Sequence, residues 1–268
     1  MLLLIFLAAS LGFVLLYVGF CGFVWWKALL MFLGLFLAFN ALVLLVAWAA
    51  SWFVDRSKPL KKQSQICRAG TVSASELLNS YSGLRVHLEG MEKLPKDKNF
   101  LLVCNHRSLF DPSVIMDKLR RYNIAFVSKP ENLKIPLIGA IGYGTGCLPI
   151  DRENDRKAVA TILAAANYVK EGICSVCIFP EGTRSRDGEL LPFHAGSFKI
   201  AQKAGAPLVI SSIRGTEKAK NNYLRRPTHV YYHILEVLPA EKVKSMSTRE
   251  LARYSMEIIE KDLHRETV

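Results

Sequence analysis

Charge is almost absent from the first 54 residues of the sequence, where Lys27 is the one Asp, Glu, Lys or Arg residue. The uncharged stretches on either side of it, residues 1–26 and 28–54, each exceed the roughly 20 residues that a membrane-spanning helix needs. A cleaved signal peptide is not expected, because no charged segment precedes the apolar run and its length is doubled. Residues 1–54 are therefore predicted to form a hydrophobic membrane-anchoring helical hairpin that breaks at Trp25-Trp26-Lys27.

Acidic residues are missing from the stretch that follows residue 55, where five basic residues come in close succession: Arg56, Lys58, Lys61, Lys62 and Arg68. By the positive-inside rule this cluster faces the cytoplasm, which predicts a protein of the cytoplasmic membrane with the domain of residues 55–268 on the cytoplasmic side. A hairpin that dips into one leaflet without crossing the bilayer has the same hydropathy, so both placements remain open.

Familiar nucleophile and metal patterns are also lacking. There is no G-x-S-x-G turn, and no cysteine has an evident base beside it. His229 and His233 fall on an expected strand, where such a spacing only places them on one face, so no metal site is predicted. Cys174 and Cys177 form a C-x-x-C, but on a strand they point to opposite faces, which favours buried structural thiols over a ligand pair or a disulfide. The pattern is typical of a reducing cytosol.

The net charge of +12 belongs almost entirely to residues 55–268, which carry +11 after Lys27 is subtracted. A basic domain attached to an apolar segment indicates an anionic partner, such as a lipid surface, a phosphorylated substrate or an acidic carrier protein. Nucleic acid is not expected, because the basic residues are scattered and no aromatic-rich basic sheet or recognition helix stands out.

Apolar runs and helical periodicity alternate along residues 84–263, without internal repeats. Strands are expected at residues 84–90, 100–103, 124–127, 147–150, 173–179, 208–213 and 230–237, and helices near 75–78 and at 112–119, 136–143, 155–170, 197–203 and 247–263. This alternation predicts an α/β fold with a mostly parallel central sheet flanked by helices. Ligands of such sheets bind beyond the carboxyl ends of the strands.

His106 and Asp111 follow one such strand end, in a turn that leads into a helix. Asp111 and Pro112 are the residue types expected at the N-cap and N1 positions of that helix. A helical spacing of five residues would place His106 and Asp111 on different faces, whereas a turn can fold back and bring them together. The carboxylate would then fix one imidazole nitrogen and leave the other basic, as a general base requires. Taken alone, a histidine followed by an aspartate five residues later could arise by chance.

A second polar turn, Phe179-Pro180-Glu181-Gly182-Thr183-Arg184-Ser185, leaves the end of another buried strand. Glu181, Thr183 and Arg184 are well placed there to hold a phosphate or a hydroxyl, with Arg184 as a bidentate donor to phosphate oxygens. The alternative is a polar loop in which Glu181 and Arg184 only pair with each other.

Four ordered segments together resemble the motif blocks of the glycerolipid acyltransferase family, in particular 1-acyl-sn-glycerol-3-phosphate acyltransferases. They are Asn105-His106-x4-Asp111, the Lys129 to Arg152 segment, Phe179 to Ser185, and Ala206-Pro207-Leu208-Val209-Ile210. The resemblance covers about residues 84–238, and a hydrophobic N-terminus is also common in that family.

The resemblance implies that His106 is the catalytic base and Asp111 its partner. It likewise implies that substrate is bound by Lys129, Arg152, Glu181, Gly182, Thr183 and Arg184. The expected reaction moves a fatty acyl group from acyl-CoA or acyl-carrier protein to the free hydroxyl of lysophosphatidate, forming phosphatidate without a cofactor. Two alternatives stay open: an acyltransferase for another lysolipid or lipid acceptor, and a catalytically silent, membrane-anchored lipid-binding protein.

Overall fold

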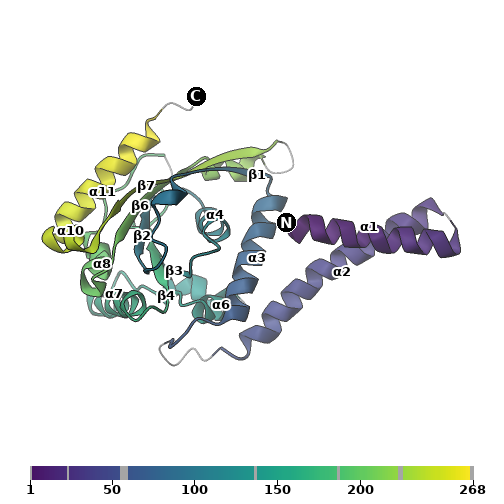
Figure 1. Cartoon of the computed structure of the whole chain (residues 1–268), viewed down its shortest axis with the longest axis horizontal. Helices are drawn as coiled ribbons and strands as arrows, with labels where there is room; N and C mark the ends of the chain where they lie inside the picture. The colour runs from purple at the N-terminus through teal and green to yellow at the C-terminus, as the bar shows by residue number, and fades with distance from the viewer. Residues whose placement is uncertain are drawn as a thin grey trace.

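The structure is a computed structural model that describes residues 2–22, 24–54, 60–135, 138–185, 188–222 and 226–265. Figure 1 shows a helical hairpin, α1 and α2, that projects away from an α/β part built around a central sheet. Several expectations fall outside the described residues: the domain boundary at Asp55, the basic residues Arg56 and Lys58, and the start of the helix expected at 136–143.

The hairpin consists of α1 (Leu2–Cys21) and α2 (Trp25–Ser51). Leu2–Cys21 and Trp25–Val43 are each long and apolar enough to cross a membrane, and few of their side chains are buried within the protein. The predicted position of the break was wrong by a few residues: α1 ends at Cys21, directly before Gly22, whose φ is 79°, and Trp25-Trp26-Lys27 form the first turn of α2. Glycine adopts this left-handed conformation without strain, so it ends the helix before the aromatic pair is reached.

Helix α3 (Gln65–Tyr81) connects the hairpin to the α/β part. The backbone N–H of Leu2 donates to Oε1 of Glu76 at 3.0 Å, and the Tyr81 hydroxyl donates to Oδ1 of Asn40 at 2.6 Å. On its other side, α3 packs against α4 (Asp111–Lys118). The sequence predicted only a short helix near residues 75–78, because the buried positions of α3 include the polar residues Ser75, Glu76 and Asn79, which weaken the apolar pattern.

The described residues form a seven-stranded sheet with the order β1-β7-β6-β2-β5-β3-β4. The strands are β1 Leu84–Glu89, β2 Leu101–Cys104, β3 Ile124–Ser128, β4 Leu148–Pro149, β5 Ser175–Ile178, β6 Leu208–Arg214 and β7 Thr228–Leu238. All neighbours are parallel except β6 and β7, so the prediction of a mostly parallel sheet is confirmed. Strand β1 lies at the edge beside β7 and thus runs against the main direction.

The remaining helices follow the expected order, with additional short elements in the connections. They are α5 Pro130–Lys134, α6 Ile138–Gly144, α7 Asp155–Lys170, α8 Lys199–Ala204, α9 Ala219–Asn222, α10 Ala240–Ser245 and α11 Thr248–Leu263, with 3-10 turns η1 Met91–Lys93, η2 Ala195–Phe198 and η3 Thr216–Lys218. Helix α7 has its predicted bounds. Helix α11 begins at a capping box in which Ser247 and Glu250 exchange side-chain and backbone hydrogen bonds.

Two apolar cores lie on the two faces of the sheet, one beneath α7, α8 and α11 and the other beneath α4 (Figure 1). Cys174 belongs to the first core and Cys177 to the second, so the two thiols face opposite sides of the sheet as predicted. Burial raises the pKa of Cys174 to about 12 and that of Cys177 well above its ordinary value. Both are free, inert thiols of the core.

Candidate active site

One edge of the sheet collects the segments that carry the predicted chemistry. Strands β2, β3, β4, β5 and β6 run parallel, so their carboxyl ends meet at that edge. The residues that leave these ends are His106 after β2, Lys129 after β3, Arg152 after β4, Glu181 after β5 and Thr216 after β6. The topology therefore brings together residues that are far apart in the sequence.

His106 and Asp111 are in direct contact: Nδ1 of the imidazole lies 2.8 Å from Oδ2 of the carboxylate. The turn between them folds back as expected. The carboxylate is fully buried, and the His106 side chain is 18% exposed. Because a carboxylate only accepts hydrogen bonds, it fixes the hydrogen of the neutral imidazole on Nδ1 and leaves the lone pair on Nε2. The site thus holds an oriented, partly accessible base.

Asp111 is held by further donors. The backbone N–H groups of Arg107 and Ser108 donate to Oδ2 at 2.7 and 2.8 Å, and the Thr216 hydroxyl donates to Oδ1. The predicted helix start was one residue late: α4 begins at Asp111 itself, and Phe110 occupies the N-cap position. The carboxylate therefore turns back to the preceding loop and accepts from it.

Glu181 is buried, and both of its carboxylate oxygens accept hydrogen bonds from the protein's own backbone. Oε1 accepts from the N–H of His106, and Oε2 accepts from the N–H of Leu191 at 3.0 Å. Burial raises the pKa of Glu181, and these two hydrogen bonds oppose that rise. The carboxylate joins the His106 turn to the loop that ends at His194. Within the described residues, no ion pair joins Glu181 to Arg184.

Gly182 marks the place where the Arg152 guanidinium approaches the turn. Its φ is 76°, and a Cβ at this position would lie 3.1 Å from Nη1 of Arg152 and 3.0 Å from Nε2 of His194. Arg152 and His194 thus converge on one side of the turn. Of the other predicted binding residues, Thr183 and Arg184 lie on the same turn with exposed side chains, and Lys129 is exposed at the N-cap of α5.

Sequence reasoning missed several side chains of this site. The Phe179 ring stacks on the His106 imidazole, His194 reaches the Gly182 turn, and Thr216 bonds to Asp111. For Thr216 a signal existed, because it follows a predicted buried strand. The rule that ligands bind beyond the carboxyl ends of strands, which identified Glu181, applies equally to Thr216. For His194 no signal was available, since it lies in an irregular loop.

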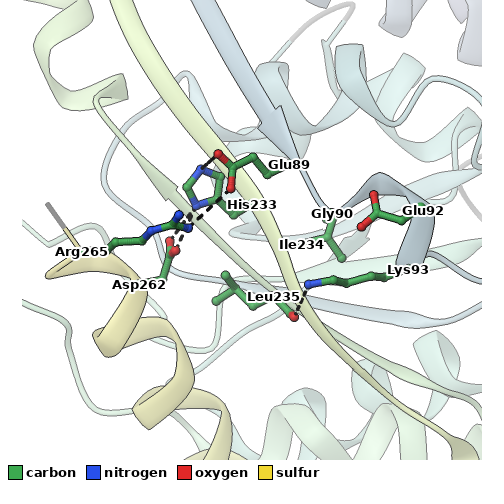
Figure 2. A pocket seen from close by; sticks show the side chains of 9 residues that line it. All are labelled: Glu89, Gly90, Glu92, Lys93, His233, Ile234, Leu235, Asp262 and Arg265. Carbon is green, nitrogen blue, oxygen red and sulfur yellow. Dashed lines mark hydrogen bonds and ion pairs between the residues drawn. The ribbon is translucent and has the colours of Figure 1, made fainter. Parts of the chain in front are cut away.

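A pocket of about 270 Å³ lies away from this edge, between β1, β7 and the end of α11 (Figure 2). His233 Nδ1 lies 3.0 Å from Oδ1 of Asp262, and its Nε2 lies 3.9 Å from Oε1 of Glu89. Arg265 lies 3.6 Å from the other oxygen of Glu89. His229 and His233 share a face of β7 as expected, and the described part of the chain contains no group of three or more residues suited to a metal ion.

Known proteins resemble the chain in sequence and in fold. Residues 85–214 match the family profile described as Acyltransferase. The 1-acyl-sn-glycerol-3-phosphate acyltransferase of Salmonella typhimurium is 33% identical over 184 residues, which cover 68% of this chain and 74% of that enzyme. The Escherichia coli enzyme of the same name is 34% identical with the same coverage. The chloroplastic enzyme BAT2 of Brassica napus is 37% identical over 142 residues, but only 40% of its length is covered.

The crystal structure of the 1-acyl-sn-glycerophosphate acyltransferase PlsC from Thermotoga maritima matches with a TM-score of 0.62 and 27% identity. The match covers 85% of this chain and 98% of that one. The chain is thus an enzyme, an acyltransferase. Within this class, the chain belongs to the family of 1-acyl-sn-glycerol-3-phosphate acyltransferases.

Proposed function

We propose that this enzyme moves a fatty acyl group from a thioester to the free hydroxyl of lysophosphatidate and so forms phosphatidate. The observation that carries the proposal is the 2.8 Å contact between His106 and a fully buried Asp111. It leaves Nε2 as a base on the same sheet edge as Arg152. The relatives named above as 1-acyl-sn-glycerol-3-phosphate acyltransferases support the choice of acceptor.

In the proposed reaction, Nε2 of His106 takes the proton of the acceptor hydroxyl while the hydroxyl oxygen attacks the thioester carbonyl carbon. The new carbon–oxygen bond forms, the carbon–sulfur bond breaks, and the imidazolium returns the proton to the departing sulfur as a free thiol. Asp111 holds the Nδ1 hydrogen throughout and stabilises the imidazolium. A positioned base contributes roughly 10²–10⁴-fold to the rate, and much of the remainder comes from holding two substrates together.

Arg152 and the Gly182-Thr183-Arg184 part of the second turn are proposed to bind the acceptor phosphate, with Lys129 nearby along the edge. A guanidinium offers two parallel donors to phosphate oxygens. Glu181 supports the same turn through its hydrogen bonds to the backbone of His106 and Leu191. No cofactor beyond the acyl donor is proposed, and the donor is acyl-CoA or acyl-carrier protein.

The test uses membranes that contain the full chain, a labelled acyl thioester and a panel of acceptors. Transfer to lysophosphatidate alone supports the proposal. Transfer to another lysolipid would mean that the enzyme uses a different acceptor, and no transfer would indicate a silent lipid-binding protein. His106→Ala should lower kcat at least about 10³-fold, within the contribution of a general base. The matched control is His87→Ala, which removes an exposed histidine on β1. Retained activity in His106→Ala would contradict the mechanism.

The catalytic part is proposed to face the cytoplasm, with both ends of the hairpin on that side. The apolar α1 and α2 support membrane association, and Lys61, Lys62 and Arg68 lie just beyond α2. A cysteine-accessibility scan around Lys27 tests the arrangement. Labelling of that turn from the distal face supports a spanning hairpin, whereas labelling from the cytoplasmic face alone supports a hairpin that dips into one leaflet.

A further inference from the structure

The hydroxyl of Thr216 donates a hydrogen bond to Oδ1 of Asp111 at 2.5 Å. Both residues are completely buried, although 105 positions separate them in the sequence. The opposite oxygen, Oδ2, accepts from the His106 ring and from two backbone N–H groups. Thr216 is therefore the side chain that engages the oxygen facing away from the imidazole.

The end of β6 is shaped to bring Thr216 to this point. Gly215 precedes it with a φ of 91°, and a Cβ there would lie 2.2 Å from the carbonyl oxygen of His229. Just before it, the Ile213 backbone N–H and carbonyl each bond the side-chain amide of Asn105 at 2.8 Å. Asn105 directly precedes His106. The same strand end thus holds both partners of the pair, one through a side chain and the other through its neighbour.

We propose that Thr216 is a positioning residue for catalysis that acts through Asp111; this inference rests on the proposed function. With both oxygens engaged, the carboxylate cannot rotate, and Oδ2 stays aligned with Nδ1 of His106. Without the hydroxyl, Oδ1 is a buried charged acceptor with no donor, which is costly in a dry interior. The carboxylate then turns away from the geometry that orients the base, and small displacements of this kind lower rates strongly.

Thr216→Val removes the hydroxyl and keeps the shape of the side chain. We expect kcat to fall at least about tenfold while KM for both substrates stays within about twofold, because the lost contact does not touch substrate. Thr216→Ser restores the donor and should return kcat to within about threefold of the original enzyme. The matched control is Thr228→Val, which removes another buried threonine hydroxyl, the one that accepts from Asn222 at 3.0 Å.

A double-mutant cycle separates positioning from a purely structural role. In an Asp111→Asn background, measured by single-turnover transfer of labelled acyl groups, adding Thr216→Val should change the rate less than about twofold. The proton NMR signal of the His106 Nδ1–H, identified by its loss in His106→Ala, should shift or vanish in Thr216→Val and persist in Thr228→Val.

Four outcomes would overturn the proposal: normal kcat in Thr216→Val, no rescue by Thr216→Ser, full additivity with Asp111→Asn, or a Thr216→Val chain that fails to fold while Thr216→Ser and Thr228→Val fold. If His106→Ala itself keeps its activity, the proposed function fails instead. If His106→Ala is inactive and Thr216→Val is normal, only this inference fails.

Discussion

The imidazole ring of His106 lies flat on the phenyl ring of Phe179, with ring centroids 4.1 Å apart and planes inclined by 17°. Phe126 from β3 also stacks on Phe179, with ring centroids 6.2 Å apart. Three aromatic rings from three neighbouring segments are thus stacked in succession. The stack fixes the plane of the imidazole, while Asp111 fixes its rotation within that plane. The base is thus oriented by two different contacts, one apolar and one charged.

Replacing Phe179 with Leu should lower kcat by about 2- to 12-fold. An aromatic pair contributes about 0.5–1.5 kcal/mol beyond its buried area, and we expect this part to orient the base in the transition state. Steady-state kinetics of Phe179→Leu and Phe126→Leu make the comparison, because the second variant removes a buried phenyl that does not stack on His106. Equal effects of the two on kcat would show that the stack contributes stability only.

Replacing Gly182 with Ala should raise KM for the phosphorylated acceptor about fivefold or more. The new Cβ meets Arg152 and His194 at about 3 Å, so the guanidinium must move. The φ of 76° adds backbone strain of roughly 1–2 kcal/mol. Gly172→Ala is the matched control, since Gly172 has a φ of 73° and a Cβ added there would meet no atom within 4 Å. Both variants should lose thermal stability, but a KM increase in Gly172→Ala as well would refute a role for Arg152.

Replacing Glu181 with Gln should lower kcat about tenfold and the free energy of unfolding by about 1–3 kcal/mol. A carboxylate accepts from the N–H of both His106 and Leu191, whereas an amide offers one acceptor oxygen and a competing donor. One backbone N–H then stays unpaired and the His106 turn shifts. Kinetics and denaturant unfolding give the two quantities. Glu171→Gln, at an exposed helix end, provides the control, and an unaffected Glu181→Gln would argue against this support of the turn.

Replacing Asp262 with Asn should destabilise the protein more at neutral pH than in acid. Burial alone would raise the pKa of Asp262, yet hydrogen bonds from His233 and Ser212 outweigh it and lower the pKa below its ordinary value. A lowered folded-state pKa stabilises the fold above the unfolded value, and this contribution disappears as the pH falls through the folded value. Unfolding should therefore be easier for the variant by about 1.5–3 kcal/mol at pH about 7.

The same unfolding measurements at about pH 3 should show a smaller difference between the two proteins. Asp97→Asn, which alters an exposed carboxyl, is the control at both pH values. A difference that stays constant across this range would mean that the carboxylate charge of Asp262 is not what ties α11 to β7.

Local patterns were sufficient for much of the fold and for the chemical pair. The uncharged stretches predicted α1 and α2, and the helical period over residues 155–170 predicted α7 with its bounds. The contact between His106 and Asp111 was predictable because a five-residue turn involves only its own backbone. These features depend on residues close together in the chain, where steric and periodic rules decide the outcome.

Only the tertiary structure decided how the pair is supported. Thr216 reaches Asp111, and Phe179 reaches His106, because β6 and β5 flank β2 in the sheet, and strand order is not encoded in any single segment. The reversed direction of β7 escaped prediction for the same reason. Such contacts arise when separate surfaces bury each other, so the sequence was enough to predict the His106–Asp111 pair, while packing between distant strands determined how the two residues are held.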